Sequence, residues 1–343
     1  GVLMMVGALV GVLFGASAQH SRYCLRAARV EVSEGRFGPR LAIWLIAFSA
    51  GVVTVQSLIA FGLLDVSQSL HLSATGSLSG AIIGGLLFGC GMILARGCAS
   101  RLLVLSATGN LRAIVTGLVL TLVAQASLRG VLSPMRESMA GWWVVPGGSA
   151  RNMLTQLGLS SGAAALCALV ALMLAFWLGY RSRIEPSRAL AAGGVGFAVG
   201  LGWLLTFMIA QNSFDVVAIS SVTFTGPSTD TLMGLVNSTD LPLGFGIGLV
   251  PGVFAGAGLM ALMSGEARIE RFGPDTPMER YLIGAVLMGY GSMLAGGCAV
   301  GAGMSGGAIF AVTAWVAVFF MWVGAMATHL VMRRQIPAAS TAT

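Results

Sequence analysis

The chain has 343 residues, of which 56% are hydrophobic and 9% are charged, whereas charged residues make up about 25% of a soluble domain. Such a composition excludes a water-soluble fold and predicts a membrane protein. The net charge of +7 comes from nineteen basic residues, all of them arginine, which are spread over connecting segments. Arginines spread in this way form no basic patch suited to nucleic acid, so nucleic acid is excluded as a partner.

Apolar runs of about 20 residues, the length needed to cross a bilayer, recur along the whole chain. We predict a single all-α membrane domain over residues 1–343, with a disordered tail at 335–343 and about nine transmembrane helices. The predicted spans are 1–18, 41–63, 80–96, 111–128, 160–179, 189–208, 243–263, 281–296 and 309–331. The first run has no preceding basic region, so we interpret it as a spanning helix and not as a signal peptide.

The arginines orient this array, because segments that remain in the cytoplasm are enriched in basic residues. Arginines follow the first span but are absent from 65–79, and they precede the sixth and eighth spans but are absent from 211–241 and 296–308. Counting alternate connections places sixteen arginines on one side and three on the other. We therefore predict an inner-membrane, multi-pass protein with its amino terminus outside and its carboxyl terminus in the cytoplasm.

One stretch occurs twice. Residues 84–101 read GGLLFGCGMILARGCASR and residues 284–301 read GAVLMGYGSMLAGGCAVG, and nine of the eighteen aligned positions are identical, including the final Gly-Cys-Ala. The first copy lies on an inward-running span and the second on an outward-running one. This predicts an inverted-topology repeat with halves at about 1–130 and 160–334, and such repeats place a transporter's binding site between the halves.

Both copies end where the helix is expected to break. The structural residues of these breaks are Gly97 and Ala99 in the first copy and Gly297 and Ala299 in the second. The short, largely uncharged segments 99–110 and 299–310 follow, and we expect them to return into the protein as short re-entrant helices. Irregular backbone at that depth needs surrounding protein or a water-filled cavity.

Cys98 and Cys298 stand at these breaks, and Cys24 follows the first span in AQHSRYCLR. A helix that begins after such a break points free N–H groups and its positive end at the break, which favours an anion. A polarizable thiol suits a soft, sulfur-bearing anion better than sulfate. The simpler alternative, that cysteine serves only for packing, stays open for all three residues. The cysteines show no metal-ligand spacing, so no metal site and no cofactor are predicted.

The repeated Gly-Cys-Ala pattern, the nine spans and the three cysteines resemble the YeeE/YedE family of membrane proteins with a sulfur-transport domain, over nearly the whole chain. The resemblance implies an hourglass-shaped protein in which Cys24, Cys98 and Cys298 bind and relay thiosulfate along a central path. It also implies a small cytoplasmic sulfur-carrier protein as a partner.

We therefore predict a transporter, not an enzyme, that takes up a small sulfur-containing anion, thiosulfate first. Transport of a selenium compound or another sulfur compound is the alternative within the family. Two alternatives come from other classes: a membrane thiol oxidoreductase, which the absence of a CxxC motif disfavours, and a nonspecific channel in which the cysteines only pack.

Overall fold

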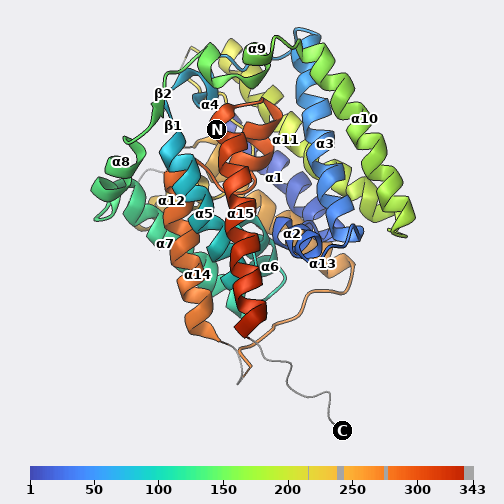
Figure 1. The fold of residues 1–343 in the computed structure, drawn as a ribbon, viewed down its shortest axis with the longest axis vertical. Helices are drawn as coiled ribbons and strands as arrows, with labels where there is room; N and C mark the ends of the chain where they lie inside the picture. Colours follow the sequence, from blue (N-terminus) through green and yellow to red (C-terminus); the bar gives the residue numbers. More distant parts are fainter. Residues whose placement is uncertain (215, 238–242, 274–276, 336–343) are drawn as a thin grey trace.

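The structure is a computed structural model that describes residues 1–214, 216–237, 243–273 and 277–335. It is almost entirely helical (Figure 1). The helices up to the middle of the chain are α1 (Val2–Ser21), α2 (Leu25–Ser33), α3 (Pro39–Ala60), α4 (Leu70–Ser73), α5 (Leu78–Leu94), α6 (Ala99–Ala107), α7 (Leu111–Arg129), α8 (Ser133–Ala140) and α9 (Met153–Leu157). Those that follow are α10 (Ser161–Arg181), α11 (Pro186–Asn212), α12 (Thr225–Asn237), α13 (Phe245–Met263), α14 (Met278–Ala295) and α15 (Val312–Gln335).

Four minor elements complete the described part of the chain. Strands β1 (Gly76–Ser77) and β2 (Val144–Val145) pair antiparallel, η1 (Ser149–Arg151) is a 3₁₀ turn, and η2 (Gly301–Gly306) is a single π-helical segment. Helix starts follow local chemistry, since the Ser77 side chain accepts from the Gly80 amide at the start of α5 and Asn110 does the same for α7. Pro39 and Pro186 occupy the first positions of α3 and α11, where a missing N–H costs nothing.

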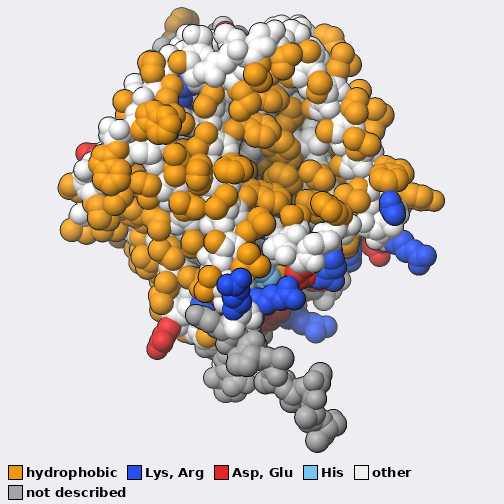
Figure 2. Space-filling view, viewed as in Figure 1, with side chains coloured by type: hydrophobic (Ala, Val, Ile, Leu, Met, Phe, Trp, Pro, Cys, Tyr) orange, Lys and Arg blue, Asp and Glu red, His pale blue; other side chains and the backbone are white. Residues whose placement is uncertain are grey.

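Eight helical segments among the described residues are long and apolar enough to cross a membrane. They correspond to eight of the nine predicted spans. The remaining prediction, 281–296, is a helix in the structure, α14, but it does not reach the hydropathy of the other eight because its first turn contains Glu279 and Arg280. Figure 2 shows hydrophobic side chains over most of one face, with arginine side chains gathered near the end of the molecule at which α15 finishes.

The predicted short helices after the two breaks are also present as α6 and η2. Most of their residues are buried, including Ala99, Leu102, Ala302 and Met304. The irregular backbone on either side is therefore covered by protein, as a membrane setting requires. Whether these segments re-enter the bilayer stays a prediction, and residues 336–343 of the predicted tail lie outside the described part.

Helices α5 and α14, which contain the repeated sequence, pack against each other through glycine. A Cβ added to Gly84 would lie 2.5 Å from the carbonyl oxygen of Gly291, and one added to Gly91 would lie 2.5 Å from that of Gly284. Conversely, a Cβ added to Gly291 would lie 2.7 Å from the carbonyl oxygen of Gly84, and one added to Gly284 would lie 2.7 Å from that of Gly91. Higher numbers on one helix meet lower numbers on the other, so the two helices run antiparallel with their backbones in contact.

Four other pairs of long helices are parallel. Gly11 and Gly15 of α1 lie against Leu249 and Val253 of α13, an advance of four residues on both helices. Residue numbers also rise together along the two helices in the pairs α3 and α11, α5 and α15, and α7 and α14, so these pairs are parallel too. Small residues on these faces allow the close approach on which helix packing within a membrane depends.

The α5–α14 contact gives the first prediction. Replacing Gly91 with alanine should destabilise the protein by about 1–3 kcal/mol or more, because the added methyl group meets backbone atoms of Gly284 and Met288 in α14, and moving a side chain does not relieve those contacts. The measurement is the midpoint of thermal unfolding of the purified protein in detergent.

The matched control is Gly193→Ala in α11, where an added Cβ has no neighbour within 4 Å. This variant should be as stable as the wild type or slightly more stable, since alanine favours the helix. A Gly91→Ala protein with an unchanged midpoint would contradict the proposed backbone contact.

Candidate functional site

Cys98 lies in the break between α5 and α6. Helix α5 ends at Leu94, Arg96 adopts a left-handed conformation with φ 55°, and Cys98 is the residue that precedes the first turn of α6. Its side chain is 1% exposed, and its Sγ hydrogen-bonds with Ser100 Oγ at 3.3 Å. Gly97 and Ala99 on either side are buried. The break is therefore a compact turn inside the protein.

Cys298 occupies the equivalent position after α14. Gly296 ends that helix with φ 78°, a conformation that glycine adopts without strain. The Gly301 amide donates to Cys298 Sγ at 3.4 Å, and the Ala302 amide donates to the Cys298 carbonyl oxygen at 2.8 Å. Cys298 and Ala299 are buried, and Gly297 is half-buried. The thiol of Cys298 thus lies at the start of the η2 segment.

Cys24 shares this geometry. Helix α1 ends at Ser21, Arg22 is left-handed with φ 54°, and Cys24 precedes the first residue of α2. In all three breaks a left-handed residue stands two positions before the cysteine; Cys24 and Cys98 directly precede a short helix, and Cys298 stands three residues before η2. Because HSRYC contains no glycine, the sequence showed Cys24 only as a residue after a span and gave no sign of this shared turn.

The structure brings the three cysteines together around one side chain, Tyr23. The Tyr23 hydroxyl lies within electrostatic range of Cys24, Cys98 and Cys298, and Cys98 in turn lies within range of the other two thiols. Tyr23 is 2% exposed and donates a hydrogen bond to Met304 Sδ at 3.0 Å. Sequence reasoning did not identify Tyr23, which only its position beside Cys24 could have suggested.

The helices that precede Cys98 and Cys298 end at different levels of their contact. Because α5 and α14 are antiparallel, Ala295 at the end of α14 lies against Gly84, whereas Ala95 just after α5 lies against Gly284. Ten residues of helix, about 15 Å of rise, separate Gly84 from the last residue of α5. The two helix ends are consequently offset along the pair, and the chain beyond them brings the thiols of Cys98 and Cys298 back within electrostatic range of each other.

A polar cavity of about 450 Å³ opens beside Cys298. We call it the His71 cavity. It is lined by His71, Arg136 and Arg151 and reaches Gly296 and Ala302, which flank the Cys298 turn. Arg151 is buried and donates hydrogen bonds to the carbonyl oxygens of Leu70 and Ala74 and to Thr313 Oγ1. Arg151 therefore gives this cavity a positive lining, whereas Arg136 is ion-paired with Glu137.

A second polar cavity, of about 350 Å³, lies beside the other two breaks. We call it the Glu266 cavity. It is lined by Gln19, Arg22, Arg101, Glu266 and Arg268, so it borders the ends of α1 and α6. Gln19 and Arg22 each donate to the Glu266 carboxylate at 2.7 Å, and the hydrogen bond from Arg22 lowers the pKa of Glu266. Figure 1 places α4 and β1, which border the His71 cavity, at the opposite end of the molecule from α6.

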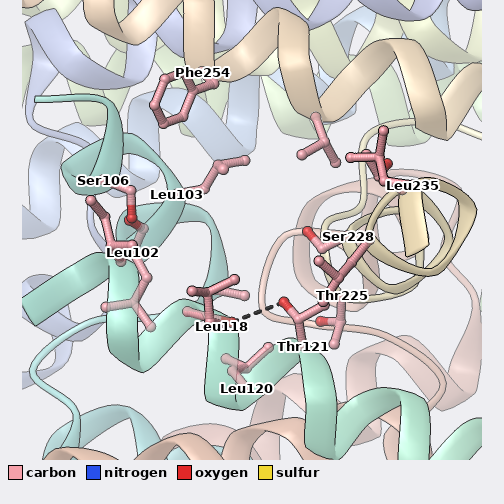
Figure 3. Close-up of a pocket in the computed structure, with 16 residues that line it drawn as sticks. Leu102, Leu103, Ser106, Leu118, Leu120, Thr121, Thr225, Ser228, Leu235 and Phe254 are labelled. Carbon is pink, nitrogen blue, oxygen red and sulfur yellow. Dashed lines mark hydrogen bonds between the residues drawn. The ribbon is translucent and has the colours of Figure 1, made fainter. Parts of the chain in front are cut away.

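A third cavity, of about 350 Å³, is apolar. It is lined by Leu103 of α6, Leu118 of α7, Leu235 of α12 and Phe254 of α13, with a few hydroxyl groups such as Ser228 (Figure 3). Its lining contains no charged side chain, and Leu118, Leu235 and Phe254 are largely exposed. An anion would lose its hydration there without compensation, so this groove is not the anion site.

Two observations concern the cysteines and the possible metal ligands of the described residues. All five cysteines are free thiols. No group of three or more His, Cys, Asp or Glu residues in the described part of the chain could hold a metal ion. The structure places the buried thiols of Cys98 and Cys298 and the half-buried thiol of Cys24 near two polar cavities, of which the second is lined by the carboxylates of Glu266 and Glu270 as well as by arginines.

Comparison with known proteins adds three findings. Residues 20–327 match the sequence profile of a family described as Sulphur transport. The chain is 27% identical over 342 residues to the thiosulfate transporter TsuA of Spirochaeta thermophila, covering 94% of this chain and 97% of that protein. It is 25% identical over 346 residues to the thiosulfate transporter TsuA of Escherichia coli, covering 94% of this chain and 92% of that protein.

The His71 cavity generates a pH prediction. Burial, and then the neighbouring Arg151, lower the pKa of His71 to about 4, whereas an unfolded histidine titrates near 6.5. The unfolded chain therefore binds the proton first, so His71 should cost no stability above pH 6.5. As the pH falls from about 6.5 to 4, the protein should lose stability on the order of 3 kcal/mol through this residue.

Thermal unfolding of the wild type and His71→Gln between pH 4 and 8 tests this prediction. The variant should lose less stability on acidification, while the control His20→Gln should behave as the wild type does. Identical pH profiles for the wild type and His71→Gln would show that His71 is not held neutral by its surroundings.

Proposed function

Because the chain belongs to the Sulphur transport family, the YeeE/YedE proteins, we propose that it takes up a small sulfur-containing anion, thiosulfate first. The observation that carries the proposal is the gathering of Cys24, Cys98 and Cys298 around Tyr23, between two arginine-lined cavities. The relatives named as thiosulfate transporters support the choice of substrate.

The proposed path follows the order of the thiols. The anion enters the His71 cavity, passes Cys298, then Cys98 and Cys24, and leaves through the Glu266 cavity. The arginines at the two cavities attract the charge, and the narrow buried segment between them gives an hourglass profile. Each thiol offers one weak S–H donor. Weak successive contacts suit transport, since a permeating ion must bind well enough to enter and loosely enough to leave.

The breaks contribute backbone groups as well as thiols. Each cysteine stands before the first turn of a helical segment, where amide N–H groups lack intrahelical partners. We propose that Gly97, Ala99, Gly297 and Ala299 serve this geometry by being small. An anion at a thiol then also meets the positive end of a short helix.

We further propose that the two halves form an inverted-topology repeat of nine crossings, with α14 as the eighth. The helix directions support this. In a nine-span array α1 and α13 run the same way, as do α3 and α11, α5 and α15, and α7 and α14, while α5 and α14 oppose each other. Every one of these relations agrees with the packing of the glycines and of Arg112 on Tyr281.

The same array has the amino terminus outside and the carboxyl terminus in the cytoplasm of a bacterial cell, which makes the His71 cavity external and the Glu266 cavity cytoplasmic. A negative-inside potential then opposes the anion by about 2.3 kcal/mol per charge per 100 mV. Uptake of a dianion therefore requires a driving force. Removal of the transported anion by a small cytoplasmic sulfur-carrier protein would supply one.

Cysteine substitutions test the proposed path. Alanine at Cys24, Cys98 or Cys298 should reduce uptake of labelled thiosulfate at least about tenfold for two or more of the three, a loss of about 1.4 kcal/mol each. Serine at the same positions keeps the size and a hydrogen-bond donor but not the soft sulfur, so uptake should fall there too. The second readout is growth with thiosulfate as the sole sulfur source.

The matched control is Cys167→Ala, because Cys167 is exposed on α10, far in sequence from every break. This variant should transport as the wild type does. Unchanged uptake in all three of the Cys24, Cys98 and Cys298 alanine variants would instead favour a channel in which the cysteines only pack.

A further inference from the structure

Arg29, on α2, is a buried arginine whose charge is uncompensated. Arg29 is 1% exposed, and none of its three guanidinium nitrogens has a hydrogen-bond partner within the described residues. Among the described residues, the ion pairs involve other arginines, namely Arg22, Arg36, Arg136 and Arg188. The close contact of the guanidinium is with a ring, since its central carbon lies 5.0 Å from the centroid of Trp322.

The position of Arg29 connects it with the cysteine cluster. Arg29 lies within electrostatic range of Cys98, Tyr23 and Cys24. Trp322, over which it lies, is packed edge-on against Trp44, with ring centroids 5.6 Å apart, and Trp44 in turn adjoins Tyr23. One continuous group of side chains therefore runs from the guanidinium to the centre of the three thiols.

A buried charge without a partner is costly, because it has lost its hydration and gained nothing equivalent. The face of a tryptophan ring offsets part of that cost, but it leaves all of the N–H donors unused. Arginines that only set membrane orientation do not need this environment, since they remain at the surface, as the exposed Arg36 and Arg333 do. Arg29 is thus a buried charge that has no counter-charge bonded to it within the described residues.

We propose that Arg29 is the counter-charge of the transported anion: its guanidinium binds the oxygen end of the anion while the sulfur end faces Cys98 and Cys24. The planar fork of N–H donors matches an oxyanion with two or more oxygens. The thiols then recognise the soft sulfur and Arg29 recognises the charged oxygens of one ion. This inference rests on the proposed function and adds to it the residue that would distinguish an anion from an uncharged sulfur compound.

The test uses Arg29→Met, which keeps the apolar length of the side chain and removes the charge. Without thiosulfate this variant should unfold at the same or a higher temperature than the wild type, because an uncompensated buried charge has been removed. Thiosulfate should raise the unfolding temperature of the wild type but not that of Arg29→Met. Initial uptake into proteoliposomes should fall at least about tenfold in the variant.

Two further variants sharpen the result. Arg29→Lys keeps the charge but not the fork, so it should transport with a raised KM and retain part of the thermal shift. Arg181→Met is the matched control, because Arg181 also lies over a tryptophan, Trp177 at 5.6 Å, but on the exposed side of α10. It should behave as the wild type in both assays.

The proposal is overturned if Arg29→Met keeps the wild-type uptake and thermal shift. It is also overturned if Arg29→Met does not fold, since the guanidinium would then be a structural requirement and not a site left open for a ligand. Failure of the underlying function has a different signature: the wild type itself would show neither uptake nor a thermal shift with thiosulfate.

Discussion

The contact of backbone with backbone between α5 and α14 is the constraint on which the rest of the structure depends. It exists because glycine stands at the same two positions of each helix, Gly84 and Gly91 against Gly284 and Gly291. Any side chain there would force the helices apart. With the helices antiparallel, the contact fixes where each one can end, so α14 ends beside the first half of α5 and α5 ends beside the first half of α14.

The helix breaks then determine the chemistry. A break exposes backbone groups that must be satisfied, and here the surrounding protein buries the turns so tightly that Cys98 and Cys298 are each 1% exposed. Near the two polar cavities the proposed path offers S–H groups, backbone amides and the hydroxyl of Tyr23. Such donors would bind an anion weakly, and in our proposal the buried charge of Arg29 supplies the long-range attraction that the thiols lack.

Much of this could be predicted from the sequence. Composition predicted a helical membrane protein, and hydropathy located the long helices because their apolar runs are uninterrupted by charge. The repeat of Gly-Cys-Ala located two of the breaks, since glycine before a short uncharged segment is a strong local signal. The span at 281–296 was located correctly as a helix, although Glu279 and Arg280 lower its hydropathy below that of the other spans.

Other features could not be predicted because they arise only when distant segments meet. The turn at Cys24 contains no glycine, so its likeness to the other two appears only in the backbone angle of Arg22. The offset between the ends of α5 and α14 depends on the antiparallel packing of two helices 200 residues apart. Tyr23 and Arg29 look like ordinary residues beside a span, and their burial among the thiols follows from the way α2 folds back against α3 and α15.

The measurement that tests the account most directly is uptake of labelled thiosulfate into proteoliposomes that contain only this purified protein, with unlabelled sulfate as a competitor. We predict uptake well above that of protein-free vesicles, and little competition from sulfate, because sulfate presents no soft sulfur to the three thiols. Uptake no greater than that of protein-free vesicles, or equal competition by sulfate, would contradict the account.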